Sequence, residues 1–516
     1  MKTESRCLRM IKKKIVRVLT VAGLLACLAS GCASGGSSVG KEAAADGIKK
    51  GGFTVAASCH DPQIIREGDT YYMFGSHMVG AKCQDLRKWN YFANGVDAAN
   101  TLFDNLLTEP YAAFDFVGKN TDNGYSVWAS NVIYNETMKK YVMYFCTTSS
   151  YVKSTLCFAT ADNIEGPYTY VDTILYSGYG KSNISETNLY DVLGKNADIS
   201  RYLEYGGYNN KEWPNCIDPA IFTDADGRMW MNYGSWSGGI FLLEIDPTTG
   251  YPIYPVDDKD ADPYYGYRLI GGGHHSAEGP YIQYDAENGY YYLFVSYGDL
   301  QSDGGYQIRQ FRSEKPTGPY VDVAGNTLED QDDHFNYGLK MMGNYTFPSL
   351  NYTYMAPGGQ STFQDDDGKY YITYHQRFDD GTEYHEPRVH QMYTNEDGWF
   401  VAAPFATMGE TLSEKGYKKS DVSGTFYVVN HGTDISSKIR EAEAYTFADG
   451  KVTGGEKSGT YEVKEGTDYI TITLDGVVYK GVLMEMTDEA ENPVFCFSAA
   501  GDNEETLWGV QYIQKE

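Results

Sequence analysis

One short pattern recurs five times between residues 53 and 405, and it restricts the fold more than any other feature of the chain. A short apolar strand is followed by a polar turn rich in Asp, Asn and Gly, and then by an aromatic strand that often contains a Tyr-Tyr pair. Each copy predicts a β-hairpin. The five predicted hairpins cover residues 62–75, 130–145, 221–233, 280–297 and 360–375.

Repeated hairpins without helical periodicity favour radial packing of four-stranded units around an axis. We therefore predict an all-β fold, a five-bladed β-propeller, with a stacked sandwich as the competing arrangement. The composition agrees with either fold. Aromatic residues make up 15% of the chain, and its 47 tyrosines and 56 glycines suit strands and tight turns.

The composition of the sequence changes near residue 421, where charged residues become more frequent. Alternating strands are predicted at 425–429, 459–463, 469–474 and 477–484, and Asp475-Gly476 is typical of a tight hairpin turn. We predict that residues 53–420 form the propeller and that residues 421–516 form a separate small β-domain. This second domain would either support the propeller or bind glycan.

The first residues are typical of a leader rather than of a folded element. A basic stretch at residues 12–14 precedes a mostly apolar run at 15–28, and small residues then lead to Cys32. The segment resembles a bacterial lipobox, which implies a signal peptide over 1–32 with Cys32 as the lipid-bearing residue. Residues 33–52 would be a flexible tether. We predict an extracellular, cell-surface lipoprotein of a bacterium, with plain secretion as the alternative.

The net charge limits the binding partners of the protein, and the cysteine pattern bears on metal binding and disulfide bonds. The formal net charge of −28 argues against nucleic acid, and against membrane contact other than through the N-terminal lipid anchor. No Cys-x-x-Cys or His-rich cluster suggests zinc. Outside the cell, the pairs Cys146 with Cys157 and Cys59 with Cys83 are candidate disulfides, although sequence does not fix the pairing. We expect a monomer.

Three of the predicted hairpins begin with a carboxylate that precedes Pro or Gly-Pro. Proline suits the first position of a strand, so three such strands in different blades would bring their first residues to one end of the propeller axis. Converging carboxylates raise the proton affinity of at least one of them, which supplies the acid and the base of glycosidic cleavage. The alternative is that the motifs only form turns. They are Cys59-His60-Asp61-Pro62, Cys216-Ile217-Asp218-Pro219 and Ser276-Ala277-Glu278-Gly279-Pro280.

At these motifs the chain resembles glycoside hydrolase family 43, and within it the two-domain endo-α-1,5-L-arabinanases. Residues 338–345 and 383–392 resemble segments specific to that group, and the similarity runs the length of the mature chain. The resemblance implies a five-bladed β-propeller followed by a small C-terminal β-barrel domain. It also implies hydrolysis of internal bonds of arabinan, a polysaccharide of pectin side chains, with inversion at the reacting carbon.

The resemblance further implies roles for individual residues. Asp61 would be the general base, Glu278 the general acid, and Asp218 the residue that orients the acid and modulates its pKa. Two tryptophans, Trp128 and Trp236, and the neighbouring Ser235 would bind substrate, because aromatic rings stack on sugars. For either Trp, core packing is the alternative.

One position departs from the pattern of the family. These enzymes often carry Pro-Gly-His on the last blade, where the His contacts a calcium ion in the central channel, but here Gly359 takes that place. Three outcomes stay open. The ion is lost, or it is held through waters and the oxygen of Gln360, or it is reached by His375 from the following strand.

Two other functions remain open at this stage. The first keeps the chemistry and changes the substrate, as in an exo-acting α-L-arabinofuranosidase or a β-xylosidase of the same family. The second is a non-catalytic lipoprotein that captures glycan at the cell surface. Retention of all three acidic residues favours an enzyme, because sugar binding alone needs no acid, base and modulator.

Overall fold

The structure is a computed structural model that describes residues 47–53, 55–328, 334–455 and 457–514. The predicted signal peptide, Cys32 and most of the predicted tether therefore lie outside the described residues. Within the described part, helices are too short or too polar to cross a membrane. The described chain is almost entirely β-structure, and α1 (Leu189–Leu193) is its single α-helix.

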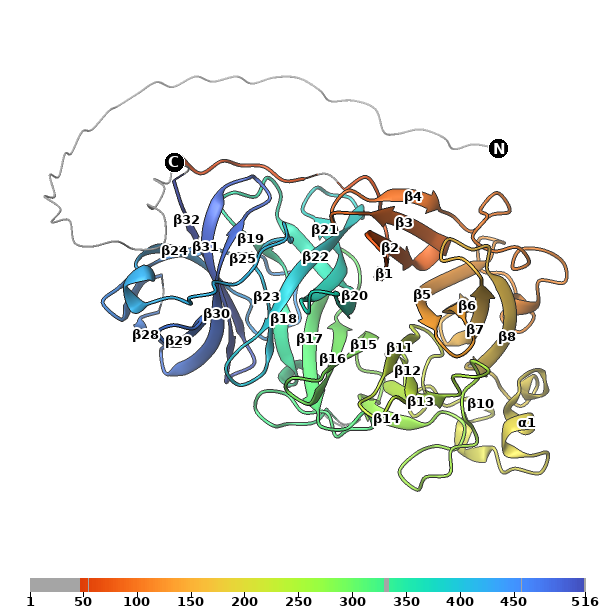
Figure 1. The fold of residues 1–516 in the computed structure, drawn as a ribbon. Coiled ribbons are helices and arrows are strands. Elements are labelled where there is room, and N and C mark those ends of the chain that lie inside the picture. Colours follow the sequence, from red (N-terminus) through yellow and green to blue (C-terminus); the bar gives the residue numbers. More distant parts are fainter. Residues whose placement is uncertain (1–46, 54, 329–333, 456, 515–516) are drawn as a thin grey trace, which may run out of the picture. The chain divides into compact units, whose positions relative to one another are not determined.

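Five antiparallel sheets follow one another along the chain as the blades of a propeller (Figure 1). In each blade the first strand lies innermost and each later strand pairs with the one before it. The first two blades are β1 (Gln63–Glu67), β2 (Thr70–Gly75), β3 (Val79–Cys83) and β4 (Asn90–Ala93), then β5 (Ser126–Asn135), β6 (Lys140–Ser150), β7 (Lys153–Ala161) and β8 (Thr169–Tyr176).

The remaining blades repeat this order, and the last of them carries two short additional strands. The third blade is β11 (Ala220–Thr223), β12 (Met229–Tyr233), β13 (Ile240–Ile245) and β14 (Tyr267–Ile270). The fourth is β15 (Ala277–Asp285), β16 (Tyr290–Tyr297), β17 (Gln307–Ser313) and β18 (Leu339–Met342). The fifth is β20 (Tyr354–Gln364), β21 (Tyr370–Phe378), β22 (His385–Thr394) and β23 (Phe400–Ala402), joined by β19 (Tyr345–Thr346).

The inner strands close the ring. Each of β1, β5, β11 and β15 contacts the inner strand of the next blade, and β20 contacts β1 again. The five hairpins predicted from the sequence are the two innermost strands of the five blades. The propeller is thus confirmed and the stacked sandwich is wrong.

Between the second and third blades the chain makes an excursion that contains α1 and a two-stranded hairpin of β9 (Leu203–Glu204) and β10 (Gly207–Tyr208). Short 3₁₀ helices lie in this excursion and in other connections. They are Ser76–Met78, Ala112–Phe114, Ile184–Glu186, Ser200–Tyr202, His334–Asn336 and Lys419–Asp421.

Eight further strands form a closed barrel after the propeller. Four phenylalanines, Phe426, Phe447, Phe495 and Phe497, fill its core. The predicted hairpin turn at Asp475-Gly476 has φ of +47° and +89°, as a two-residue turn with both residues left-handed requires. The barrel strands are β24 (Gly424–Asn430), β26 (Glu443–Ala448), β27 (Lys451–Gly454), β28 (Gly459–Val463), β29 (Tyr469–Leu474), β30 (Val477–Thr487), β31 (Pro493–Gly501) and β32 (Thr506–Tyr512).

The barrel is bonded to the last two blades. Strand β25 (Arg440–Glu441) leaves the barrel sequence and pairs in parallel with β19 of the fifth blade. From the fourth blade, the fully buried Arg309 donates to the carbonyl of Tyr337, at 2.9 Å, and to that of Thr433, which belongs to the barrel segment. These contacts join the second domain to the propeller, and its role, support of the propeller or glycan binding, stays a prediction.

The end of the predicted tether packs onto the folded chain. The amide of Gly51 donates to the carbonyl of Ser349 at 2.9 Å, and the amide of Lys49 donates to Oδ1 of Asn492 at 3.0 Å. The segment 47–53 is therefore fixed against both the fifth blade and the barrel.

The candidate disulfides are absent from the described residues, in which all six cysteines are free and buried. In the β6–β7 ladder, Cys146 lies opposite Leu156 and Cys157 lies opposite Phe145. Paired residues share a face and successive residues alternate, so the two thiols point to opposite faces of the sheet. The Cys146–Cys157 expectation is therefore wrong. Cys59 and Cys83 share one buried cluster without being bonded.

Candidate active site

The inner strands present their first residues to a narrow central channel, a cavity of about 40 Å³. At this level the backbone is left-handed in several blades, with φ of +54° at Asp61, +57° at Asp218, +56° at Gly279 and +58° at Gly359. Residues other than Gly rarely adopt this conformation, although Asp does so more readily than most. The repeated geometry explains why short Asp-Pro and Gly-Pro motifs begin these strands.

A second cavity of about 230 Å³ contains all three predicted carboxylates in its lining, together with His60, Trp128 and Tyr306. The side chain of Asp61 is 24% exposed and thus reaches the solvent of this cleft. The structure therefore brings Asp61, Asp218 and Glu278 together from three different blades, as the sequence predicts. Their catalytic roles stay a prediction.

Asp61 is held in its ionised form. Its Oδ2 lies 3.1 Å from Nδ1 of His60 and accepts a hydrogen bond of 2.6 Å from the hydroxyl of Ser76. Burial raises the pKa of Asp61, but the charge of His60 and the hydrogen bonds from His60 and Ser76 outweigh burial and bring the pKa to about 2. The low pKa keeps Asp61 ionised, which is the form that a general base requires.

Glu278 is held by three side chains. Its Oε2 accepts hydrogen bonds of 3.0 Å from the hydroxyl of Ser235 and 3.0 Å from the indole N–H of Trp236. Its Oε1 accepts one of 2.7 Å from the hydroxyl of Tyr306. Burial raises the pKa of Glu278, the hydrogen bonds from Tyr306 and Ser235 oppose that rise, and the charge of Asp61 adds to it. The net upward shift favours a protonated acid.

The third carboxylate, Asp218, is affected by the charges of both other carboxylates. Burial, followed by the charges of Asp61 and Glu278, raises the pKa of Asp218 well above its usual range. Its Oδ2 accepts a 3.1 Å hydrogen bond from the amide of Gly279, the residue after Glu278. Asp218 thus positions the backbone that carries the acid.

The three predicted substrate-binding residues occupy different places. Trp128 lines the cleft with 38% of its surface exposed, which suits contact with a sugar. Ser235 is buried, and both it and Trp236 direct a polar hydrogen to Glu278. The structure therefore gives Ser235 and Trp236 a positioning contact with the acid, whereas substrate binding by any of the three stays a prediction.

Residues from the fifth blade complete the site, and sequence reasoning assigned no catalytic part to them. Nη2 of Arg377 lies 3.2 Å from Nε2 of His60, and Nε of Arg377 bonds to Glu383 at 2.9 Å. Arg377, like Ser76 and Tyr306, lies at the end of a strand or just beyond it and belongs to no local motif. Only the closure of the ring brings these side chains to the cleft.

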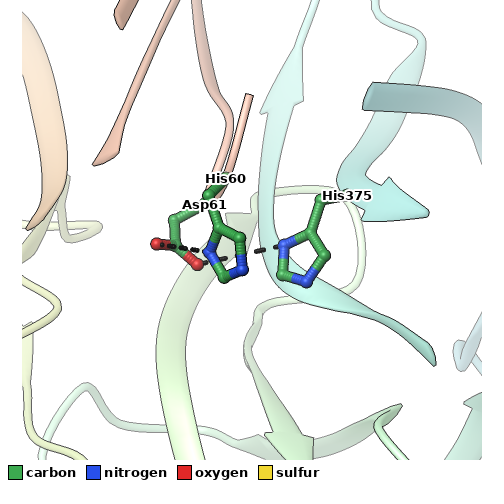
Figure 2. A group of neighbouring side chains, drawn as sticks. All are labelled: His60, Asp61 and His375. Carbon is green, nitrogen blue, oxygen red and sulfur yellow. Dashed lines mark ion pairs between the residues drawn. The ribbon is translucent and has the colours of Figure 1, made fainter. Parts of the chain in front are cut away.

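The metal expectation rests on His375, which comes from β21 and faces Asp61 (Figure 2). Nitrogens of His60 and His375 and an oxygen of Asp61 all lie within 4.8 Å of one another. His375 is fully buried, and neither of its ring nitrogens has a hydrogen-bond partner among the described residues. Burial lowers the pKa of His375 well below its usual value, so the ring is neutral and offers a lone pair.

Position 359 admits no side chain in this arrangement. A Cβ built on Gly359 would lie 2.4 Å from Oδ1 of Asp61 and 2.8 Å from Nδ1 of His375. The ring of His375 thus takes the space that a side chain at 359 would need. Gln360 is already engaged, since its oxygen accepts from Ser296 and its nitrogen donates to the carbonyl of Gly279. Of the predicted ligands, His375 has two ring nitrogens without a hydrogen-bond partner among the described residues, whereas the oxygen of Gln360 already accepts one hydrogen bond; a metal at either residue stays a prediction.

Comparison with known proteins agrees with the predicted family and fold. Residues 192–400 match the model of glycosyl hydrolases family 43, and residues 404–509 match a C-terminal lipocalin-like domain. The chain is 38% identical over 467 residues to extracellular endo-α-(1→5)-L-arabinanase 2 of Bacillus subtilis, which covers 88% of this chain and 92% of that protein. It is 36% identical over 472 residues to an extracellular endo-α-(1→5)-L-arabinanase of Thermotoga petrophila. That alignment covers 88% of this chain and 94% of the relative.

Solved structures give the same result for the architecture. The family 43 glycoside hydrolase YxiA of Bacillus licheniformis superimposes with a TM-score of 0.78 at 36% identity, covering 90% of this chain and all of that one. Endo-1,5-α-L-arabinanase of Thermotoga petrophila superimposes with a TM-score of 0.77 at 34% identity. The match covers 90% of this chain and 99% of that one. This chain therefore belongs to glycosyl hydrolases family 43.

Proposed function

We propose that the protein is an endo-acting glycoside hydrolase that cleaves internal α-1,5-L-arabinofuranosidic bonds of arabinan. The observation that carries the proposal is the convergence of Asp61 and Glu278 on one cleft, where their surroundings lower the pKa of Asp61 and raise that of Glu278. Family membership supplies the reaction class, and the relatives named above are endo-arabinanases over nearly the whole chain.

The two carboxyl groups divide the work of hydrolysis. Glu278 gives its proton to the oxygen that leaves as the C1–O bond breaks. Asp61 takes a proton from the water whose oxygen forms the new bond to C1 on the opposite face, which inverts the configuration at that carbon. Afterwards Glu278 regains a proton from solvent and Asp61 releases one, so the enzyme returns to its starting state.

The surrounding residues keep the two groups in these states. His60 and Ser76 stabilise the negative charge of Asp61 through a 3.1 Å contact and a 2.6 Å hydrogen bond. Asp61 raises the pKa of both Glu278 and Asp218, while Tyr306 and Trp236 fix the carboxyl group of Glu278. Trp128 offers an exposed ring to the sugar in the cleft.

We propose His375 as the protein ligand of a calcium ion, with water molecules completing the oxygen-rich shell that this ion prefers. A bound cation would supply a positive charge beside Asp61. Such a charge strengthens the preference of Asp61 for its ionised form, which His60 and Ser76 already favour.

We also propose that the protein works outside the cell, attached through a lipid on Cys32. The relatives named above are extracellular enzymes, and the leader sequence carries the anchor prediction. Metabolic labelling with an alkyne fatty acid checks the anchor. Label on the wild type and none on Cys32→Ala supports it, whereas equal label or none on both forms contradicts it.

The function is tested with the purified mature chain on linear arabinan, with product lengths followed over time. Mixed short oligosaccharides at early times are expected from an endo enzyme, and Glu278→Gln is expected to lose at least about a thousandfold in kcat. Arabinose as the sole early product would instead indicate exo action. Binding without cleavage of arabinan or xylan would leave a glycan-capture protein.

A further inference from the structure

A groove outside the catalytic cleft runs along the fifth blade, where three segments distant in sequence meet. It is lined by residues 51–53, residues 351–354 and residues 378–388, and we call it the blade-5 groove. Its volume of about 410 Å³ lies within the range of ligand-binding clefts, roughly 300–1,000 Å³. No residue assigned to the reaction lines it.

The apolar part of the groove is aromatic throughout. Tyr352 and Tyr384 stand at its surface, 58% and 47% exposed, although large side chains of this kind are usually better covered. Below them, the ring of Phe378 contacts Tyr352 at 6.2 Å and Tyr354 at 5.4 Å between centroids. Phe53 completes the aromatic lining. A connected aromatic surface that is open to solvent offers flat faces to a ligand.

The polar part of the groove is held in place from below. Nη1 of the buried Arg388 bonds to Oε2 of Glu386 at 2.9 Å, and its guanidinium lies 4.7 Å from the centre of the Phe53 ring. The hydroxyl of Tyr384 donates to the other oxygen of Glu386 at 3.3 Å. Glu386 and Arg388 neutralise each other, and Asp380 adds one negative charge to the lining, so the groove offers hydrogen-bond acceptors to hydroxyl groups and disfavours an anionic ligand.

The groove and the catalytic cleft share one loop. Tyr384 follows Glu383, whose Oε2 accepts a 2.9 Å bond from Arg377. Arg377 in turn lies 3.2 Å from His60, the neighbour of the proposed base. The loop 379–384 therefore has Asp380 and Tyr384 in the groove and Glu383 in the network behind Asp61.

We propose that the blade-5 groove is a second saccharide-binding site, which holds a segment of the polysaccharide while another segment lies in the catalytic cleft. The aromatic faces cover the C–H surface of the sugar rings, and Asn351, Asp380 and Glu386 bond to hydroxyl groups. A neutral, hydroxyl-rich chain matches both parts of the lining. The identity of that chain as arabinan rests on the proposed function.

The test uses two tyrosines whose removal leaves the floor of the groove intact. In the Glu278→Gln background, the double variant Tyr352→Ala/Tyr384→Ala is compared with its parent by electrophoresis in gels that contain linear arabinan. We expect the affinity to fall about tenfold. Tyr205→Ala is the matched control, because Tyr205 is fully exposed and lines neither cavity.

A second measurement uses the active enzyme and separates binding from misfolding. The ratio of kcat/KM on polymeric arabinan to kcat/KM on arabinotriose is expected to fall about fivefold or more in the double variant, since only the polymer reaches both sites. A folding defect would lower both values together and leave the ratio unchanged. Should the double variant not fold, Tyr352→Ala alone provides the same comparison.

The outcomes distinguish this proposal from the proposed function. If wild type cleaves arabinan while the double variant keeps the gel retardation and the ratio of its parent, the groove proposal is overturned and the function stands. If wild type fails to cleave arabinan but another neutral polysaccharide retards it through the two tyrosines, the function is overturned and the groove stands. Absence of retardation by arabinan and xylan alike overturns the groove.

Discussion

The hydroxyl of Tyr306 donates a 2.7 Å hydrogen bond to Oε1 of Glu278. Tyr306 is 2% exposed, and its ring stacks on His375 with 5.7 Å between centroids. Its hydroxyl therefore has little freedom to move away from the carboxyl group. This contact links the proposed acid on β15 to the part of the fifth blade that faces Asp61.

Tyr306→Phe is expected to shift the pH profile upward. The hydroxyl stabilises the ionised form of Glu278, so its loss raises the pKa of Glu278 further and moves the alkaline limb of kcat/KM to higher pH. We also expect kcat/KM at the optimum to fall about tenfold, because one hydrogen bond to a charged group is lost. Tyr374→Phe is the control, since the Tyr374 hydroxyl lies 2.9 Å from His390 instead. An unmoved alkaline limb would contradict the assignment of Glu278 as the acid.

Trp128→Ala is expected to change binding rather than proton transfer. Its exposed ring lines the cleft, so removing it should raise KM for arabinooligosaccharides about tenfold and leave the pH limbs in place. Trp236→Phe serves as the contrast, because it removes the N–H that donates to Glu278 and should move the alkaline limb upward. Equal KM values for Trp128→Ala and wild type would show that the ring does not touch the sugar.

The sequence predicts the blades and the carboxylates for one physical reason. Two inner strands begin with a residue of left-handed φ followed by a proline, which needs no amide hydrogen bond, and these are Asp61-Pro62 and Asp218-Pro219. Because equivalent strands meet at the axis, the same motif locates both a blade and a catalytic group.

Other parts of the site leave no such signal. Tyr306 and Arg377 carry residue types that occur as often in the core of an aromatic propeller, and only ring closure shows that they reach Glu278 and His60. The expected bridge between Cys146 and Cys157 failed because it depends on which face each strand position takes. A ladder that pairs Cys146 with Leu156 separates the two thiols.

Calcium is expected to stabilise the wild-type enzyme and not His375→Ala. A ligand that binds only the folded state adds about 3 kcal/mol when its free concentration is about one hundred times its dissociation constant. The melting temperature of wild type should therefore fall when a chelator removes the ion and recover when calcium is restored. His385→Ala is the control, because His385 packs against His60 at 4.9 Å yet lies outside the group of candidate ligands. The same response in His375→Ala and wild type would remove His375 from the site.

Glu504, in the barrel segment, is expected to make the stability of the protein fall as pH rises. Burial, and then the charge of Asp322, raise the pKa of Glu504 to about 8. Between the ordinary pKa of 4.5 and about 8, the folded chain holds a proton that the unfolded chain releases, so this group stabilises the fold at low pH and the stabilisation is lost through that window.

Glu504→Gln should therefore raise the free energy of unfolding at pH 8 by about 1–2 kcal/mol and change it little at pH 5, as measured by chemical denaturation. Glu505→Gln is expected to change the free energy of unfolding in the opposite direction. Although burial raises the pKa of Glu505, hydrogen bonds from Tyr479 and Asn430 lower it overall, so its ionised form is favoured in the fold. Its loss should destabilise the protein by similar amounts at pH 8 and pH 5 and by less at pH 3, where the carboxyl group becomes protonated. If Glu504→Gln changed the free energy of unfolding equally at pH 5 and pH 8, the buried proton on Glu504 would be excluded.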